Sequence, residues 1–467
     1  MNLTGNQPAP DSVGVADRRA QMHRSILRTL SALVISTLVA GQVIAQTPTE
    51  DKTTLKELVI SALETHERVE IAESEIRRAL ADRKLARSAI MPRVNLNGAY
   101  TFYGQETAIE LSPGEVFVIQ PSQDWSWSAD LRQTLFYGLR PWRARNIAKL
   151  NYDIAQLDKQ TTINNLTLQV AASFLTARAA EERVEVRRVA LEQIKGQLKV
   201  ASRRFEVGEV ASADVARWRA EVAGAKQAYV VAKGDATFAL HSLARLTGVA
   251  ELQSLERLGP VPTPPGDADT LISTAYEDRW EMKTLYHQLE AAGLWIKLEK
   301  GAYLPELEAT AQYFQQKAAF PSQGWASLVL SLKVPIYQGG AVQANVAKAR
   351  EDLRQVELLE QTLRRTIADQ VDSAFIGYEA ADAAFDAARE RTKAATEAYR
   401  QVKSAYRVGE TSSVALLDAT TEAIDAETTH IIARAQREFQ AISLRHAIGL
   451  FPLPDLDYAD FEPETEE

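Results

Sequence analysis

Apolar residues follow helical spacing through two long intervals of this chain. Residues 142–259 and 336–451 contain no proline, and apolar side chains recur there every three or four positions. The spacing is marked by Leu166, Val170, Phe174 and Ala177 in the first interval and by Ile367, Val371, Ala374 and Tyr378 in the second. A helix from Pro141 to Val207 would measure roughly 100 Å at about 1.5 Å per residue. We expect helices of this length to pack side by side, as in a coiled coil.

Four shorter segments alternate between apolar and polar residues, as β-strands do. Residues 93–103 and 125–132 form one pair, and residues 307–313 and 326–334 form another. Each run is close to the roughly 9 to 11 residues of a tilted membrane strand. Residues 105–123, rich in Pro, Gly and Ser, predict a loop. Aromatic residues near the strand ends fit a membrane interface: Tyr100, Phe102, Trp125, Trp127, Tyr313 and Trp325.

The two halves of the chain repeat one another. The end of each hairpin, Gly138 and Gly339, and each glycine of a later turn, Gly208 and Gly409, lie 201 residues apart. Pro92 and Pro305, ahead of each first strand, lie 213 apart, so the first half has 12 extra residues in its hairpin loop. Each half therefore predicts a helix, two strands, a very long helix, a turn and a further helix.

The repeat defines the expected domain organisation. The first repeat covers residues 46–262 and the second covers residues 263–451, with the boundary in the stretch from Pro260 to Pro265. Residues 452–467 form an acidic C-terminal tail that we expect either to hang loose or to wrap around the helices.

Residues 22–46 carry the three parts of a secretory signal. Arg24 and Arg28 precede an apolar run over residues 30–43, and Ala45 offers a cleavage site before Gln46. We therefore expect residues 1–45 to be removed on export. The alternative is an N-terminal membrane anchor, but the run is short for that role and is interrupted by polar residues.

Composition excludes several classes of function. Lys and Arg total 53 against 62 Asp and Glu, a net charge of −9, so no nucleic acid is expected as a partner. With no cysteine, the chain has neither disulfides nor thiolate chemistry. The six histidines lack metal-ligand spacing, and neither a phosphate loop nor a nucleophile elbow is present. We predict no enzyme activity, no metal and no cofactor.

The strands raise a problem that one chain cannot solve. Four strands cannot close a barrel, and an open sheet edge in lipid leaves backbone groups unpaired at a cost of several kcal/mol each. If the strands span a membrane, the copies must pool them. Two copies would give about eight strands, filled by side chains, whereas three would give about twelve and could leave a lumen. On patterning alone, two surface hairpins on a helical body fit equally well.

The features together resemble the TolC family of outer-membrane factors over nearly all of the chain after residue 45. Two features match the family pattern: Pro92 and Pro305 precede the two hairpins, and the hairpins end in residues 133–138 and 334–340. The most specific segments are the two turns. They cover residues 204–215, which begin Arg204-Phe205-Glu206-Val207-Gly208-Glu209, and residues 405–419, which begin Ala405-Tyr406-Arg407-Val408-Gly409-Glu410.

The resemblance implies a mainly α fold with a small β part. Long coiled-coil-like helices would form a periplasmic tunnel, and four transmembrane strands per chain would complete a 12-stranded barrel of a homotrimer in the outer membrane of a Gram-negative bacterium. The implied partners are a periplasmic adaptor, an inner-membrane transporter and outer-membrane lipid. The implied function is a passive exit for efflux or type I secretion. The rival interpretation is a soluble periplasmic coiled-coil scaffold.

The resemblance also assigns residues at the periplasmic tip. The adaptor-docking turns would be Val207, Gly208 and Glu209 together with Val408, Gly409 and Glu410. Tyr406 matches the gate tyrosine of the family and Asp214 its acidic partner. The basic gate residue falls on Thr411, so the usual gating link cannot be copied, and we hypothesise that Arg407 substitutes for it.

Asp418 matches an acidic position that lines the constriction in the family. Threefold symmetry would repeat it as a ring that attracts cations. The second aspartate of the family falls on Ala415, which predicts weaker cation selectivity. The alternative for Asp418 is a solvated charge on a helix surface.

Overall fold

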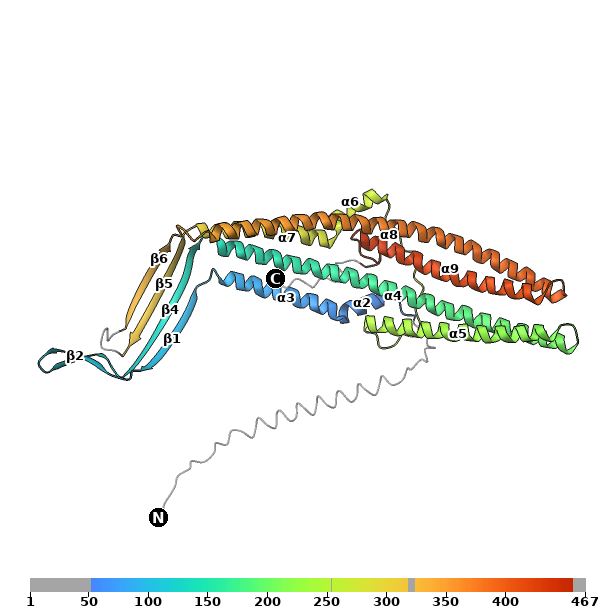
Figure 1. Ribbon diagram of the computed structural model, residues 1–467, viewed down its shortest axis with the longest axis horizontal. Helices are drawn as coiled ribbons and strands as arrows, with labels where there is room; N and C mark the ends of the chain where they lie inside the picture. The colour runs from blue at the N-terminus through green and yellow to red at the C-terminus, as the bar shows by residue number, and fades with distance from the viewer. Residues whose placement is uncertain (1–51, 253, 318–323, 457–467) are drawn as a thin grey trace, which may run out of the picture. The chain divides into compact units, whose positions relative to one another are not determined.

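Long helices make up most of the chain, and a small antiparallel sheet lies at one end of them (Figure 1). The computed structural model describes residues 52–252, 254–317 and 324–456. The expected signal sequence, residues 1–45, lies outside the described residues. The prediction of a mainly α fold with a small β part is confirmed.

The helices form two long hairpins with shorter helices packed beside them. Helix α4 packs against α5, and α8 packs against α9; α2 and α3 lie on α4, α6 and α7 lie on α8, and α4 also contacts α7 and α9. Their bounds are α2 (Leu55–Thr65), α3 (Glu67–Ser88), α4 (Arg140–Glu206), α5 (Ser212–Thr247), α6 (Ala268–Asp278), α7 (Trp280–Lys300), α8 (Ala341–Val408) and α9 (Ser413–Ala447), with a 3-10 turn, η1 (Gly301–Tyr303), after α7.

Local sequence explains where these helices begin. Thr54 and Glu57 form a reciprocal capping box at the start of α2. Pro141 lies in the first turn of α4, where a missing N–H costs nothing. The Ser412 hydroxyl accepts a hydrogen bond from the Ala415 amide at the start of α9. The sequence therefore marks the starts of α2, α4 and α9.

One sheet combines the strands of both repeats. Its antiparallel order is β1 (Arg93–Phe102), β4 (Gln123–Tyr137), β5 (Glu306–Gln316) and β6 (Trp325–Lys333). The pairing of β4 with β5 joins the repeats, from Ser126 opposite Gln316 to Tyr137 opposite Glu306. Strands β1 and β6 are left as edges.

The loop expected over residues 105–123 is wrong in part. Two further strands, β2 (Thr107–Ser112) and β3 (Glu115–Gln120), form a separate hairpin there. Apolar and β-branched residues flank the Pro113–Gly114 turn, and Gly114 supplies the positive φ of 91°. The turn residues therefore mark the tip of a hairpin within the predicted loop.

Three apolar clusters form the core of the helical part. The first joins α2, α4, α5 and α9 around Phe174 and Leu243. The second joins α6, α7, α8 and α9 around Met282 and Ile367. The third lies near the turns of the long hairpins, around Trp218 and Leu416. Leu453 and Leu456, from the expected tail, are buried in the first cluster, whereas residues 457–467 lie outside the described chain.

Candidate channel wall and tip

The four-stranded sheet has one apolar face that is open to the surroundings. Paired residues share a face, and faces alternate along each strand. The register places Val94 opposite Leu131, Leu131 opposite Ala311, and Ala311 opposite Leu328. The large side chains at the two edges are between 64% and 76% exposed: Val94, Leu96, Leu328, Leu330 and Leu332. An exposed apolar face of this kind is expected on a surface that meets another apolar medium.

The opposite face of the sheet is mostly polar, although Phe314, Trp325 and Val329 also lie on it. The Asn95 and Asn97 amides donate hydrogen bonds to the two carboxylate oxygens of Asp130, at 2.9 and 2.8 Å. Arg132 lies 3.6 Å from Glu308 on the neighbouring strand. Strands that are apolar outside and polar inside are the pattern of a membrane channel wall.

The six predicted interface aromatics gather at one end of the sheet, away from the helices. Tyr100 pairs with Trp125, and Phe314 pairs with Trp325. The Trp127 and Tyr313 rings lie 5.2 Å apart between centroids, and the Tyr100 and Phe102 rings lie 4.9 Å apart. All six side chains are at least partly exposed. Five of them share the apolar face, whereas Trp325 lies opposite Phe314 on the other face at the same end of the sheet.

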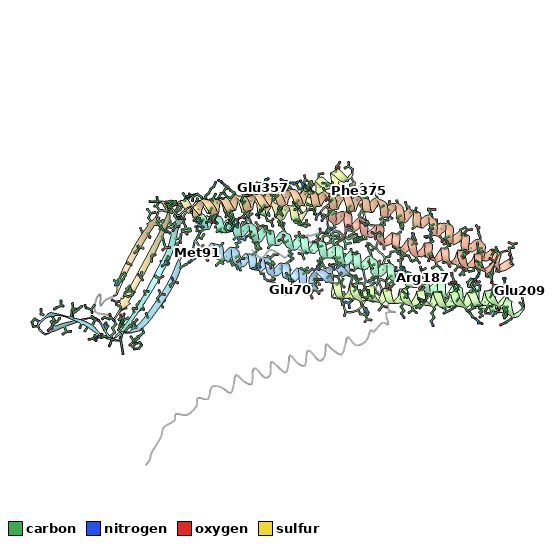
Figure 2. The ribbon with its side chains drawn as sticks, viewed as in Figure 1. Glu70, Met91, Arg187, Glu209, Glu357 and Phe375 are labelled. Atoms are coloured by element: carbon green, nitrogen blue, oxygen red, sulfur yellow. The ribbon has the colours of Figure 1, made fainter. Side chains whose placement is uncertain are left out.

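The two expected turns lie at the other end of the helices (Figure 1). Gly208, with φ of 81°, ends α4, and Gly409, with φ of 86°, ends α8. The amides of Glu209 and Glu410 donate to the carbonyls of Arg204 and Ala405, so both turns close in the same way. Figure 2 labels Glu209 at this tip.

Two contacts join the hairpins α4–α5 and α8–α9 at the tip. The Arg204 guanidinium donates to the carbonyls of Tyr406 at 3.3 Å and Arg407 at 2.9 Å. Its centre lies 5.0 Å from the centroid of the Tyr406 ring. The Ser413 hydroxyl donates to the Asp214 carboxylate at 2.6 Å. Beneath these contacts, Trp218 and Leu416 pack with Tyr406 in the third cluster.

The predicted gate residues therefore divide into two groups. Tyr406 is buried and Asp214 is bonded to the facing hairpin, so both lie where the hairpins meet. Arg407 contributes its carbonyl to that contact, while its side chain is exposed. Thr411 is half-buried and Asp418 is exposed. Sequence reasoning missed the roles of Arg204 and Ser413, although both lie in the segments that carried the family resemblance.

A charged cluster links α4, α9 and the segment between the repeats. Glu182 on α4 forms ion pairs with Arg178, Arg257 and Arg434. Although burial opposes ionisation of Glu182, these arginines lower its pKa. Glu438 lies 4.0 Å from Arg434, but burial dominates there and raises the pKa of Glu438 to about 7. The cluster thus holds one stably ionised carboxylate beside one that titrates near neutrality.

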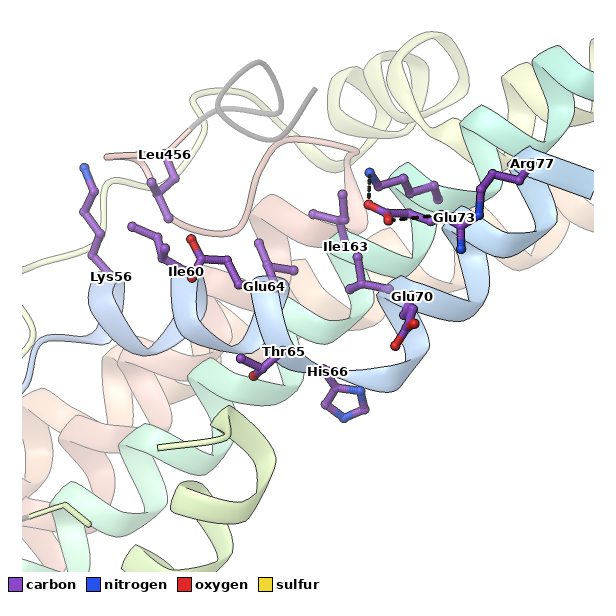
Figure 3. Close-up of a pocket in the computed structure, with 13 residues that line it drawn as sticks. Lys56, Ile60, Glu64, Thr65, His66, Glu70, Glu73, Arg77, Ile163 and Leu456 are labelled. Atoms are coloured by element: carbon purple, nitrogen blue, oxygen red, sulfur yellow. Dashed lines mark hydrogen bonds and ion pairs between the residues drawn. The ribbon is translucent and has the colours of Figure 1, made fainter. Parts of the chain in front are cut away.

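Figure 3 shows a cavity of about 740 Å³ beside the bend between α2 and α3. Its charged lining is balanced, since it contains three carboxylates, Glu64, Glu70 and Glu73, and three cations, Lys56, Arg77 and Lys159. Lys159 and Glu73 neutralise one another at 3.0 Å. The cavity therefore favours neither an anion nor a cation.

Neither a membrane-spanning helix nor a metal-binding group of side chains occurs in the part of the chain that the structure describes. Among residues 52–252, 254–317 and 324–456, every helix lacks the combination of length and apolar character needed to cross a membrane. The same residues contain no group of three or more His, Asp or Glu side chains placed to hold a metal ion.

The amphipathic sheet and the long helical hairpins together define a channel subunit of the outer membrane. The chain belongs to the outer membrane efflux protein family, whose model matches residues 58–249 and 271–450. It is accordingly an outer-membrane protein of Gram-negative bacteria with a periplasmic extension, and it provides a channel for efflux. The predicted resemblance to the TolC family is confirmed.

Known relatives agree over most of the chain. The outer membrane protein TolC of Escherichia coli (strain K12) is 23% identical over 419 residues, which cover 84% of this chain and 83% of that protein. The CmeC outer membrane channel of Campylobacter jejuni has a TM-score of 0.73 at 16% identity and covers 87% of this chain and 88% of its own. The MtrE outer membrane channel of Neisseria gonorrhoeae, in its open state, has a TM-score of 0.71 at 20% identity, with 85% and 89% covered. The two channel structures share the fold of this chain.

Proposed function

We propose that three copies of this chain form one channel and that a periplasmic adaptor connects it to an inner-membrane transporter. Each copy contributes four strands to a 12-stranded barrel, while the long helices continue the passage through the periplasm. The channel is a passive exit for efflux or type I secretion and not an enzyme. Energy for transport then comes from the transporter.

The proposal rests mainly on the four-stranded sheet, which has an exposed apolar face, a polar face and two edge strands. Unpaired backbone groups at β1 and β6 cost several kcal/mol each in lipid, so each edge needs a strand from a neighbouring copy. Three identical sheets pair edge to edge and place Asp130 and Arg132 toward the lumen. The aromatic cluster around Trp127 and Tyr313 then lies at one membrane interface.

The tip supplies the other part of the proposal. The turns Val207-Gly208-Glu209 and Val408-Gly409-Glu410 are exposed at the end farthest from the sheet, where an adaptor from the inner membrane would reach them. The contacts around Tyr406 and Asp214 hold the hairpins together and act as the gate. Asp418, repeated in three copies, forms a ring that attracts cations.

Adjacent residues of β6 provide a matched test. Leu330 lies on the apolar face and Ser331 on the polar face, and both are exposed in a single chain. A lysine at position 330 would face lipid, so Leu330→Lys should destabilise the protein by about 2–4 kcal/mol per chain. A lysine at position 331 would face the lumen, so Ser331→Lys should be tolerated. We expect Leu330→Lys to abolish heat-sensitive trimers in outer-membrane extracts and Ser331→Lys to preserve them.

The rival scaffold predicts a different result. In a soluble coiled-coil protein both positions face water, so the two variants would behave alike. The chain would also be recovered from the periplasmic fraction without detergent. Either result would contradict the channel.

A further inference from the structure

We propose that Arg204 is the residue that fastens hairpin α8–α9 to hairpin α4–α5 at the tip, and that it acts on backbone carbonyls of α8. The inference rests on the proposed channel function. It assigns to Arg204 the role of the basic gate residue that was hypothesised for Arg407 from the sequence. The acceptors are the carbonyls of Tyr406 and Arg407, in the last turn of α8.

The last carbonyls of a helix lack partners within the helix. The Gly409 amide donates to the Tyr406 carbonyl at 3.2 Å and uses one of its two acceptor sites. Arg204 supplies a donor for the second site and another for Arg407. A guanidinium is suited to this role because it presents several N–H groups in a fixed plane and carries a positive charge toward the negative end of the helix dipole.

Two neighbours hold the guanidinium in place. Its centre lies 5.0 Å from the centroid of the Tyr406 ring, which is itself buried. The Glu209 carboxylate lies 3.8 Å away on the turn of the same hairpin. Arg204 is only partly exposed, so these contacts are less screened than those of a surface arginine.

The link is asymmetric between the repeats. The residue 201 positions after Arg204 is Ala405, which has no group to return the contact. Removing Arg204 therefore removes the whole contact, whereas a side-chain substitution in α8 leaves its acceptors in place. The Ser413–Asp214 hydrogen bond remains as a second link between the same hairpins.

Single-channel conductance of the purified protein in planar lipid bilayers tests this assignment. Arg204→Ala is expected to raise the time-averaged conductance several-fold, and Arg204→Lys is expected to lie between that variant and the wild type. The matched control is Arg203→Ala, an exposed arginine in the same last turn of α4. Arg203→Ala and Arg407→Ala are both expected to conduct like the wild type.

The outcomes separate the two proposals. A wild-type protein that never forms channels contradicts the proposed function. A conducting wild type with an unchanged Arg204→Ala overturns the role of Arg204. If Arg204→Ala is not recovered as a heat-sensitive trimer, the conductance of Arg204→Lys is measured instead. A wild-type conductance in Arg204→Lys would then overturn the assignment. A rise for Arg407→Ala that equals the rise for Arg204→Ala also overturns it.

Discussion

The two repeats share one helical plan but differ where the chain meets its surroundings. The bends between α2 and α3 at His66 and between α6 and α7 at Arg279 lie 213 residues apart and have the same extended backbone. Gln169 on α4 and Gln370 on α8, 201 residues apart, each accept a hydrogen bond from an arginine at the neighbouring bend. Among the described residues the β2–β3 hairpin occurs in the first repeat alone, and the position equivalent to Arg204 in the second repeat is Ala405. The shared plan therefore builds the helices, and the differences lie at the sheet and the tip.

The largest expected effect compares Gly138 with Gly339, which hold equivalent positions. Both have positive φ, 58° and 62°. A Cβ at Gly138 would lie 2.0 Å from the Gly301 carbonyl oxygen, whereas a Cβ at Gly339 would meet no atom within 4 Å. Gly339→Ala should cost about 1–2 kcal/mol through backbone strain. Gly138→Ala should cost about 4 kcal/mol because backbone must also move.

Thermal unfolding of the two variants in detergent, followed by circular dichroism, measures this difference. The unchanged wild type is the reference for both. If the two variants lost the same stability, Gly138 would not lie in close contact with Gly301 in the assembled protein.

The next comparison concerns the arginines at the two bends. Arg279 is buried, pairs with Glu281 at 2.8 Å and also reaches Gln370 and the Ala447 carbonyl. Although burial opposes ionisation of Glu281, Arg279 lowers the pKa of that carboxyl. Arg279→Ala should therefore lower the free energy of unfolding by about 2–3 kcal/mol.

The equivalent contact in the first repeat comes from Arg68, which is exposed. Arg68→Ala should change the free energy of unfolding by less than about 0.5 kcal/mol. Denaturant titration of both variants gives the two values. A loss for Arg68→Ala as large as that for Arg279→Ala would contradict the difference in burial.

The smallest effect concerns Glu438, which stands where the first repeat has Thr237. Burial raises the pKa of Glu438 to about 7 from an ordinary value of 4.5, despite the opposing charge of Arg434 on α9. Glu182 on α4 adds to the rise, while Arg257 and Arg437 oppose it. Between pH 4.5 and 7 the folded protein keeps a proton that the unfolded chain loses, so stability falls as pH rises through this window.

Glu438→Gln removes this fall because glutamine stays neutral. The variant should match the wild type near pH 4.5. At pH 8 it should exceed the wild-type free energy of unfolding by about 1–2 kcal/mol, less than the full pKa shift would give because solvent still screens the carboxylate. Glu390→Gln, on the exposed surface of α8, is the control that should keep the wild-type pH dependence. An unchanged pH slope in Glu438→Gln would show that the carboxyl is solvated in the assembled channel.

Much of the fold could be predicted from sequence because long periodic segments leave few alternatives. The proline-free intervals predicted α4 and α8 closely, and alternation located the strands of the main sheet. The β2–β3 hairpin was missed because Pro113 and Gly114 indicated a loop, although apolar and β-branched residues flank that turn in the sequence. The bend at His66 was not predicted because the residues around it are compatible with a continuous helix.

The site was less predictable for a physical reason. Gly208 and Gly409 were found because a turn between helices requires residues that tolerate positive φ. Arg204 acts on backbone carbonyls, which every residue has, so no residue type in α8 reveals its partner. In the alignment of the two repeats, Arg204 stands opposite Ala405, and this difference was the one feature of the sequence that pointed to Arg204.

In the proposed channel, a single chain is too small a part of the wall to exist alone in lipid. The mass of the protein purified from outer membranes in detergent, measured by native mass spectrometry, tests it most directly. We expect a complex of three chains. A folded single chain of this protein, stable in detergent and in water alike, would contradict it.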